Sequence, residues 1–275
     1  MTRTRSKTVA DAGARSEPEP ARRDLEGHPV DPDARPSAPR GRRASRVAGA
    51  TKENRMTKLR LYSAKACPFA HRTRLVLQEK AIDHELTEVD LQNKPRAFVD
   101  ASLYGKVPAI EHEGHRIWES AIINEYLEEV FPDPPLLPRE PGRRALARIW
   151  IDHANTRLVP AFGQLLRAET PDQEAEGRKA LGDVLAFIER EALAKSSGPY
   201  WLGAEVSLVD LAFYPWFERL PAVGRLRGFS IPAELTRLRA WLDAVQARDA
   251  VRANLNPVDF YVERYAKFVK PATAA

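Results

Sequence analysis

Residues 58–77 read KLRLYSAKACPFAHRTRLVL, and this stretch decides the fold of the chain. The apolar positions of Leu59–Tyr62 predict a strand, and the segment from Pro68 to about Ala81 is predicted to be a helix. Pro68 suits the first helical turn, because the N–H group that proline lacks would have no partner there. Cys67 is therefore expected to be the N-cap residue, where free N–H groups and the helix dipole favour its thiolate.

Strand and helix patterns continue to alternate beyond this first unit. We expect a strand at 84–89, a helix at 94–102, a hairpin of 108–111 with 116–118, and a helix at 120–131. The last of these has Ile123, Leu127, Val130 and Phe131 on one stripe. The order β-α-β-α-β-β-α predicts a small mixed sheet with a terminal hairpin.

The second half of the chain has helical patterns only. Helices are predicted at 143–168, at 171–194, from Ser207 onward with an acidic residue at Asp210 to complete a capping box, and around 235–245. Pro215 is expected to break the helix that begins near Ser207. The predicted organisation is an α/β domain over 56–132, a proline-rich linker over 133–139 and an all-helical domain over 140–275.

Residues 1–55 differ in composition from the rest. They contain 13 Lys and Arg, 8 Asp and Glu, several prolines and no aromatic residue, so we expect a disordered tail. Met56 directly precedes the first strand, which raises the hypothesis that translation starts there; a transit peptide or a nucleic-acid-binding arm fits this mixed-sign segment less well. The tail carries the whole formal charge of +5, so the folded part gives no electrostatic indication of nucleic acid as a partner.

The cysteine count limits the chemistry. One cysteine cannot form an internal disulfide, which favours a reducing compartment, and with no apolar membrane span or secretion signal we expect a cytoplasmic protein. A mixed disulfide at Cys67 would have to be resolved by an external thiol, for which glutathione is the abundant candidate. A lone cysteine is often just a small buried residue, but the strand–Cys–Pro–helix setting favours a reactive thiol.

Five separate stretches resemble one known family, the glutathione transferases, and in particular their omega class. They are CPFAHRTRLVL from Cys67, DLQNKP from Asp90, KVPAI from Lys106, IWESAIINEYLEE from Ile117 and SLVDLAFYPWFERL from Ser207. The resemblance covers about 210 residues with matching order and spacing. It implies a thioredoxin-like N-terminal domain followed by an all-α C-terminal domain, in a homodimer.

The resemblance also implies roles for individual residues. Cys67 corresponds to the catalytic cysteine and Phe69 lies beside glutathione. Lys94 approaches the glycyl carboxylate, Val107 pairs with the cysteinyl backbone before a cis-proline at Pro108, and Glu119 with Ser120 holds the γ-glutamyl end. Without the resemblance, the last two would be interpreted as an ordinary helix cap, and Lys94 as a solvated charge.

The implied activity is glutathione-dependent thiol transfer, including deglutathionylation and dehydroascorbate reduction, through a Cys67–glutathione disulfide. The partners are then glutathione and a small electrophilic or disulfide substrate, in a detoxifying role, with no metal, nucleic acid or membrane. Two alternatives stay open: conjugation of glutathione to electrophiles, and a non-catalytic binding or regulatory module of the same fold.

Other conspicuous residues are given ordinary structural interpretations. His71 could assist the thiolate but is expected to be an exposed polar residue. His112 and His115 flank a turn without a third metal ligand. The aromatic set of the helical half could line a substrate pocket but is expected to be core: Trp150, His153, Tyr214, Trp216 and Phe217.

Overall fold

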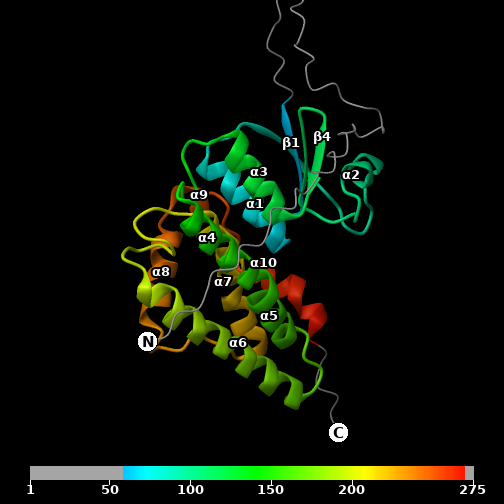
Figure 1. Cartoon of the computed structure of the whole chain (residues 1–275). Helices are drawn as coiled ribbons and strands as arrows, with labels where there is room; N and C mark the ends of the chain where they lie inside the picture. Colours follow the sequence, from blue (N-terminus) through cyan, green and yellow to red (C-terminus); the bar gives the residue numbers. More distant parts are fainter. Residues whose placement is uncertain (1–57, 270–275) are drawn as a thin grey trace, which may run out of the picture. The chain divides into compact units, whose positions relative to one another are not determined.

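The computed structural model describes residues 58–269. Its N-terminal part contains a four-stranded mixed sheet (Figure 1). The strand order is β2-β1-β3-β4, in which β1 pairs in parallel with β2 and antiparallel with β3, and β3 and β4 form a hairpin. The strands are β1 (Leu59–Ser63), β2 (His84–Glu88), β3 (Ala109–His112) and β4 (His115–Trp118). This arrangement confirms the predicted mixed sheet with a terminal hairpin.

Three helices cover this sheet. α1 (Pro68–Glu79) and α3 (Ser120–Val130) pack together on one side, and α2 (Arg96–Ala101) lies on the other side against β3 and β4 (Figure 1). Ile123 and Leu127 of α3 are fully buried, as their spacing predicted, whereas Val130 is exposed at the end of the helix. The N-terminal half is therefore a thioredoxin-like layer structure.

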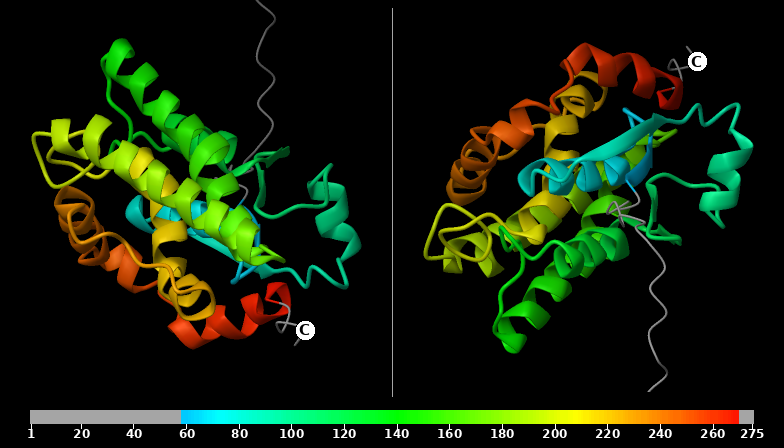
Figure 2. Two further views of the ribbon diagram at one scale, coloured as in Figure 1. Left: turned by 90° about the horizontal axis from the view of Figure 1, so that it is seen from below. Right: turned by 90° about the horizontal axis from the view of Figure 1, so that it is seen from above.

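The second half is helical throughout. α4 (Pro141–His153) continues through a π-helical turn (Ala154–Leu158) into α5 (Val159–Leu166), and α6 (Pro171–Glu191) lies alongside α5 (Figure 2). The remaining elements are a 3₁₀ turn (Leu193–Lys195), α7 (Leu208–Arg227), α8 (Thr236–Gln246), α9 (Asp249–Arg252), α10 (Val258–Tyr265) and a 3₁₀ turn (Ala266–Phe268). Within residues 58–269, none of these helices is long and apolar enough to span a bilayer.

α7 is the central helix of this half. It contacts α1, α4, α5, α8 and α10, and nearly all of its side chains are buried. Ser207 and Asp210 form the predicted capping box at its start. The prediction that Pro215 breaks this helix was wrong: α7 runs continuously through Pro215 and Pro221, because packing on all sides outweighs the lost backbone hydrogen bonds.

The helical half holds α1 at several points. Near its C-terminal end, the Arg248 guanidinium donates to both Glu79 carboxylate oxygens at 2.6 Å. In its first half, Arg72 Nε donates to the Ala212 carbonyl of α7 at 2.8 Å. Both halves belong to one compact unit, and α1 packs against helices of each half.

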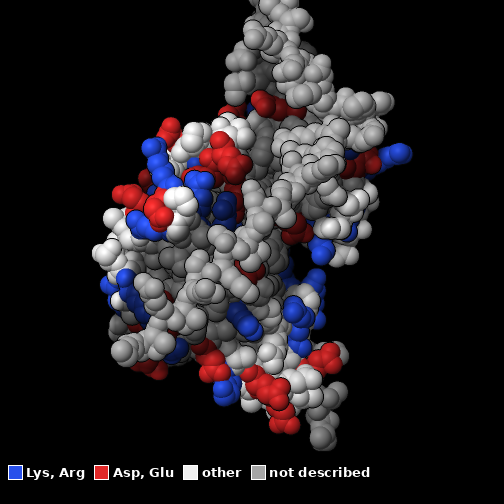
Figure 3. All heavy atoms as spheres, in the orientation of Figure 1, with Lys and Arg blue, Asp and Glu red and all other residues white. Residues whose placement is uncertain are grey.

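Charges of both signs are mixed on the face of the molecule that Figure 3 shows. On the face that Figure 3 shows, basic and acidic side chains lie close to one another without a large single-sign patch. Many of them are exposed ion pairs, such as Arg148 with Glu125 and Lys179 with Asp183. Such pairs add little stability individually.

Candidate functional site

Cys67 is the N-cap residue of α1, as its position before Pro68 predicted. Its backbone is extended (φ −76°, ψ 120°) while Pro68 already occupies the first helical position. The half-buried thiol lies 3.6 Å from the Val107 carbonyl oxygen, to which it can donate weakly. The sulfur therefore lies where the first turn of α1 meets the loop before β3.

A cis peptide bond shapes that loop. The Val107–Pro108 bond is cis, as the family resemblance implied. Val107 and Pro108 are both buried, and the chain enters β3 directly after them. The Val107 carbonyl oxygen lies beside the Cys67 sulfur, and Val107 forms one wall of the site.

Glu119 and Ser120 lie at the junction of β4 and α3. Glu119 has a φ of 70°, which is strained for a residue with a Cβ, and it is the N-cap residue of α3. Such strain costs about 1–3 kcal/mol and is concentrated at functional sites in known structures. Ser120 is buried at the first position of the helix, where free N–H groups favour an anion.

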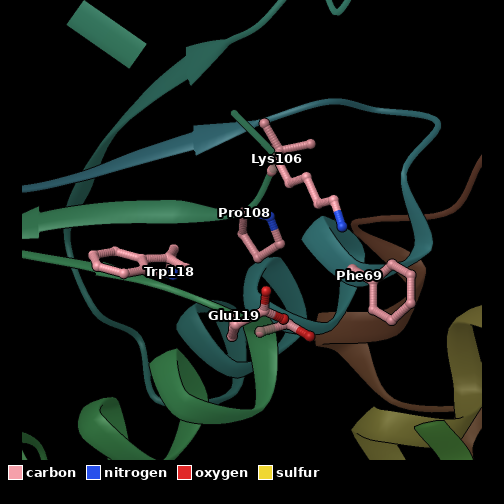
Figure 4. Close-up of a pocket in the computed structure, with 7 residues that line it drawn as sticks. Phe69, Lys106, Pro108, Trp118 and Glu119 are labelled. Carbon is pink, nitrogen blue, oxygen red and sulfur yellow. The ribbon is translucent and has the colours of Figure 1, made fainter. Parts of the chain in front are cut away.

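A cavity of about 120 Å³ lies between these segments (Figure 4). Its volume is below the roughly 300 Å³ of a common ligand pocket, so it would accommodate one part of a peptide-sized molecule. Five of the predicted glutathione-binding residues line it, together with two others: Phe69, Val107, Pro108, Glu119 and Ser120, with Lys106 and Trp118. Cys67 adjoins it through its contact with Val107.

Two family models match this chain. The N-terminal domain of glutathione S-transferases matches residues 66–130, and their C-terminal domain matches residues 150–244. The chain belongs to the glutathione S-transferase family. It is a glutathione-dependent transferase of the omega-like type, and the thioredoxin-like and all-helical halves are the fold of that family.

Individual relatives show how similar this transferase is to known members of the family. It is 33% identical over 203 residues to glutathione S-transferase omega-1 of Sus scrofa, covering 73% of this chain and 82% of the relative. It is 34% identical over 210 residues to glutathione S-transferase U19 of Arabidopsis thaliana, covering 73% and 93%. Among solved structures, glutathione transferase Omega 3C of Trametes versicolor matches with a TM-score of 0.71 and 33% identity, over 78% of this chain and 91% of that one.

Lys94 lies apart from the other predicted residues of the transferase site. It is exposed and does not line the cavity, although its ammonium passes close to Gly105. Lys106 lines the cavity instead, and its side chain extends toward Phe69 (Figure 4). The sequence offered a signal for Lys106, because it immediately precedes the cis-proline pair, whereas Trp118 was identifiable only as the neighbour of Glu119.

A buried cation lies behind the cavity wall. Arg72 stacks on Trp216 at 4.4 Å from the ring centroid and donates to Asn155 of the π-helical turn at 2.6 Å. Phe69 meets Trp216 edge-on, with centroids 5.1 Å apart. Burial lowers the pKa of Arg72 to about 9, while the nearby Cys67 acts in the opposite direction.

His71 was wrongly expected to be exposed. It is fully buried, and its Nδ1 lies 3.0 Å from Glu218 Oε2 of α7. Burial lowers its pKa to about 4, against the opposing effect of Glu218. The prediction failed because it considered α1 alone, whereas α7 covers the side of α1 that carries His71.

The remaining aromatic and histidine residues have structural roles. Tyr214, Trp216 and Phe217 are buried in the core, as expected, whereas Trp150 and His153 are only half-buried. His112 Nδ1 lies 2.8 Å from the Tyr126 hydroxyl, which ties β3 to α3. Over residues 58–269, no three His, Cys, Asp or Glu side chains are grouped as a metal site.

Proposed function

We propose that Cys67 is the nucleophile of a glutathione-dependent thiol transferase. The observation that carries this proposal is the position of its sulfur at the N-cap of α1, 3.6 Å from Val107 at the edge of the cavity. The helix N-terminus favours the thiolate, and a thiolate attacks disulfides at neutral pH. Five of the residues proposed to bind glutathione line this cavity.

The γ-glutamyl end of glutathione would lie in the cavity, at Glu119 and Ser120. The Ser120 hydroxyl and the first N–H groups of α3 suit its carboxylate, and the Glu119 carboxylate suits its ammonium. The backbone of Val107, before Pro108, would pair with the cysteinyl residue. Lys94 is proposed for the glycyl carboxylate, and the cavity geometry favours Lys106 for the same role.

The reaction would proceed by two exchanges. The Cys67 thiolate attacks the glutathione sulfur of a mixed disulfide, forming a Cys67–glutathione disulfide and releasing the substrate thiolate. A second glutathione thiolate attacks the same glutathione sulfur, forming oxidised glutathione and restoring the Cys67 thiolate. Overall, the mixed disulfide and one glutathione give the substrate thiol and oxidised glutathione, so the added glutathione is the only reductant consumed. Dehydroascorbate is a further proposed substrate of this reducing site.

The decisive experiment compares the wild type with Cys67→Ser. We expect the wild type to reduce a glutathione mixed disulfide and the variant to fall to the uncatalysed rate, because a hydroxyl does not form the intermediate. Retention of the variant on immobilised glutathione is the control for an intact binding site. Substantial activity in a retained Cys67→Ser variant would overturn the mechanism.

Conjugation of glutathione to electrophiles is the second candidate. It is favoured by the apolar ring of Phe69, which lines the cavity and packs edge-on against the buried Trp216. In that case the thiol would be needed only to activate glutathione. Turnover of 1-chloro-2,4-dinitrobenzene by the wild type, faster than its reduction of disulfides, would support conjugation.

We also propose a homodimer in the cytoplasm. Ile122 of α3 and Leu146 with Ile149 of α4 are exposed large apolar residues on adjacent helices. Arg148 bridges these helices by its ion pair with Glu125. Apolar residues beside charges of both signs suit a self-complementary interface. The domain boundaries at 56–132, 133–139 and 140–275 stay a proposal, and residues 1–55 lie outside the described part.

A further inference from the structure

The loop before Cys67 is gripped by Arg74 of α1. Its Nη1 donates to the Ser63 hydroxyl at 2.6 Å and to the Ala64 carbonyl at 3.3 Å, and its Nη2 donates to the Lys65 carbonyl at 3.3 Å. The Cys67 N–H adds a bond of 2.9 Å to the Ala64 carbonyl. One guanidinium thus holds three consecutive residues, the last residue of β1 and the first two of the loop.

The last carbonyl of the loop, that of Ala66, is held from the other half of the molecule. Arg219 of α7 donates to it through Nη2 at 3.2 Å, while its Nη1 donates to the Pro215 carbonyl at 2.6 Å. The Arg219 side chain is fully buried. This carbonyl belongs to the peptide bond between Ala66 and Cys67. A side chain of α7 therefore helps to fix the orientation of that peptide plane.

Arg219 is itself held in place. Its guanidinium stacks on the Tyr261 ring at 4.4 Å, and the Tyr261 hydroxyl donates to Glu218 Oε1 at 2.9 Å. Glu218 also accepts from the Asn256 N–H at 3.1 Å and lies against His71. A buried guanidinium is costly unless its surroundings compensate it. The Glu218 carboxylate, 3.8 Å from Arg219 Nη1, offsets part of this cost, while Nη2 of the same guanidinium donates to Ala66.

We propose that Arg219 is a positioning residue for the reaction at Cys67, acting through the Ala66 carbonyl. By binding this carbonyl it directs the negative end of the Ala66–Cys67 peptide dipole toward α7, next to the N-terminus of α1. Together with Arg74 it forms a clamp on residues 63–66. The inference rests on the proposed role of Cys67 as the nucleophile, and it adds that the helical domain controls the reactivity of that nucleophile.

Other charges near the clamp must be separated from this effect. Arg72 and Arg74 interact electrostatically with Cys67 from α1, and Tyr265 does so from α10. Glu88 accepts from the Lys65 N–H at 2.6 Å, and His71 and Glu218 face Arg219. Lysine at position 219 would keep a positive charge but lose the planar fork, so it distinguishes geometry from charge.

The test is alkylation by iodoacetamide, followed from pH 5 to pH 10. The chain has a single cysteine, so the rate reports Cys67 alone, and the measurement needs neither glutathione nor turnover. The variants are Arg219→Met and Arg219→Lys, with Arg225→Met as the matched control, since Arg225 is an exposed arginine of the same helix. Circular dichroism and thermal melting verify that each is folded.

We expect Arg219→Met to slow alkylation at pH 7 about tenfold and to move the rise of the rate to higher pH, as for loss of one charge-assisted hydrogen bond. Arg219→Lys should slow alkylation several-fold, and Arg225→Met should be alkylated at the wild-type rate. In steady-state disulfide reduction, kcat should fall while KM for glutathione stays within about twofold, since Arg219 does not line the cavity.

A folded Arg219→Met variant whose pH profile superimposes on that of the wild type overturns the proposal. If the methionine variant does not fold, a wild-type profile for Arg219→Lys overturns it equally. If alkylation is slower in Arg219→Met but the wild type has no thiol-transferase activity, the clamp is supported and only the proposed function is refuted. The two failures are therefore distinguishable.

Discussion

At the scale of single residues, the site contains two kinds of group. Some were identified as site residues from the sequence, and others have hydrogen-bond partners that only the folded structure reveals. The site residues lie together because they stand at the ends of elements that meet at one end of the sheet: Cys67 before α1, Val107 and Pro108 before β3, and Glu119 and Ser120 between β4 and α3. His71 and Arg219, by contrast, lie 148 residues apart, and their contact depends on how α7 packs against α1.

The buried His71 gives a prediction about stability and pH. Its pKa of about 4 lies below the ordinary 6.5, so below pH 6.5 the unfolded chain takes up a proton that the folded protein excludes. The free energy of unfolding should fall by up to about 3 kcal/mol between pH 7 and pH 4 from this group alone. Urea unfolding at each pH measures this. The free energy of unfolding should fall less steeply with decreasing pH in His71→Asn than in the wild type, and as steeply as in the wild type in the exposed His115→Asn. The same pH dependence in all three proteins would refute this assignment.

At the scale of elements, α7 depends on a single buried carboxylate. Asp210 Oδ2 accepts from the Ser207 N–H and hydroxyl at 2.8 and 2.6 Å, and Oδ1 accepts from the Trp201 N–H and the Trp241 indole at 2.9 and 2.8 Å. Burial raises the pKa of Asp210, and these hydrogen bonds act against that rise.

Removal of this carboxylate should be severe. Asp210→Ala leaves four donors without their acceptor, and we expect the free energy of unfolding to fall by about 3 kcal/mol or more. Tryptophan fluorescence during urea unfolding measures it, since Trp201 and Trp241 are buried at the site. The control is Asp183→Ala in the exposed pair of α6, which should change stability by less than about 0.5 kcal/mol. A loss at Asp210 no larger than in the control would contradict the capping argument.

The elements themselves could largely be predicted, and their deviations have physical causes. Periodicity and capping residues predicted the strands, the hairpin and the long helices of residues 58–269, because these signals are local. Pro215 misled because the cost of proline in a helix is local, whereas the burial that outweighs it comes from five neighbouring elements. Lys106 precedes the cis-proline pair in the sequence, but only the fold shows that it lines the cavity and that Lys94 does not.

At the scale of the whole molecule, the exposed apolar residues of α3 and α4 predict association. Light scattering after size-exclusion chromatography should give about twice the chain mass of 30.9 kDa for the wild type. Ile149→Glu should run as a monomer, because it places a charge in the centre of the proposed interface. Leu255→Glu, at an exposed apolar position elsewhere, should stay dimeric. A monomeric wild type would rule out this interface.

The attachment of α1 to both halves has a consequence for how such transferases diversify. The helix that carries the thiol is tied to the helical domain near its C-terminal end by Arg248, and near its N-terminal end by Arg219 and Glu218. A recombination event that exchanged the helical domain would therefore bring in a new second-substrate region and, with it, a different support for the nucleophile. Substrate range and intrinsic thiol reactivity would be inherited together, so selection on one would alter the other.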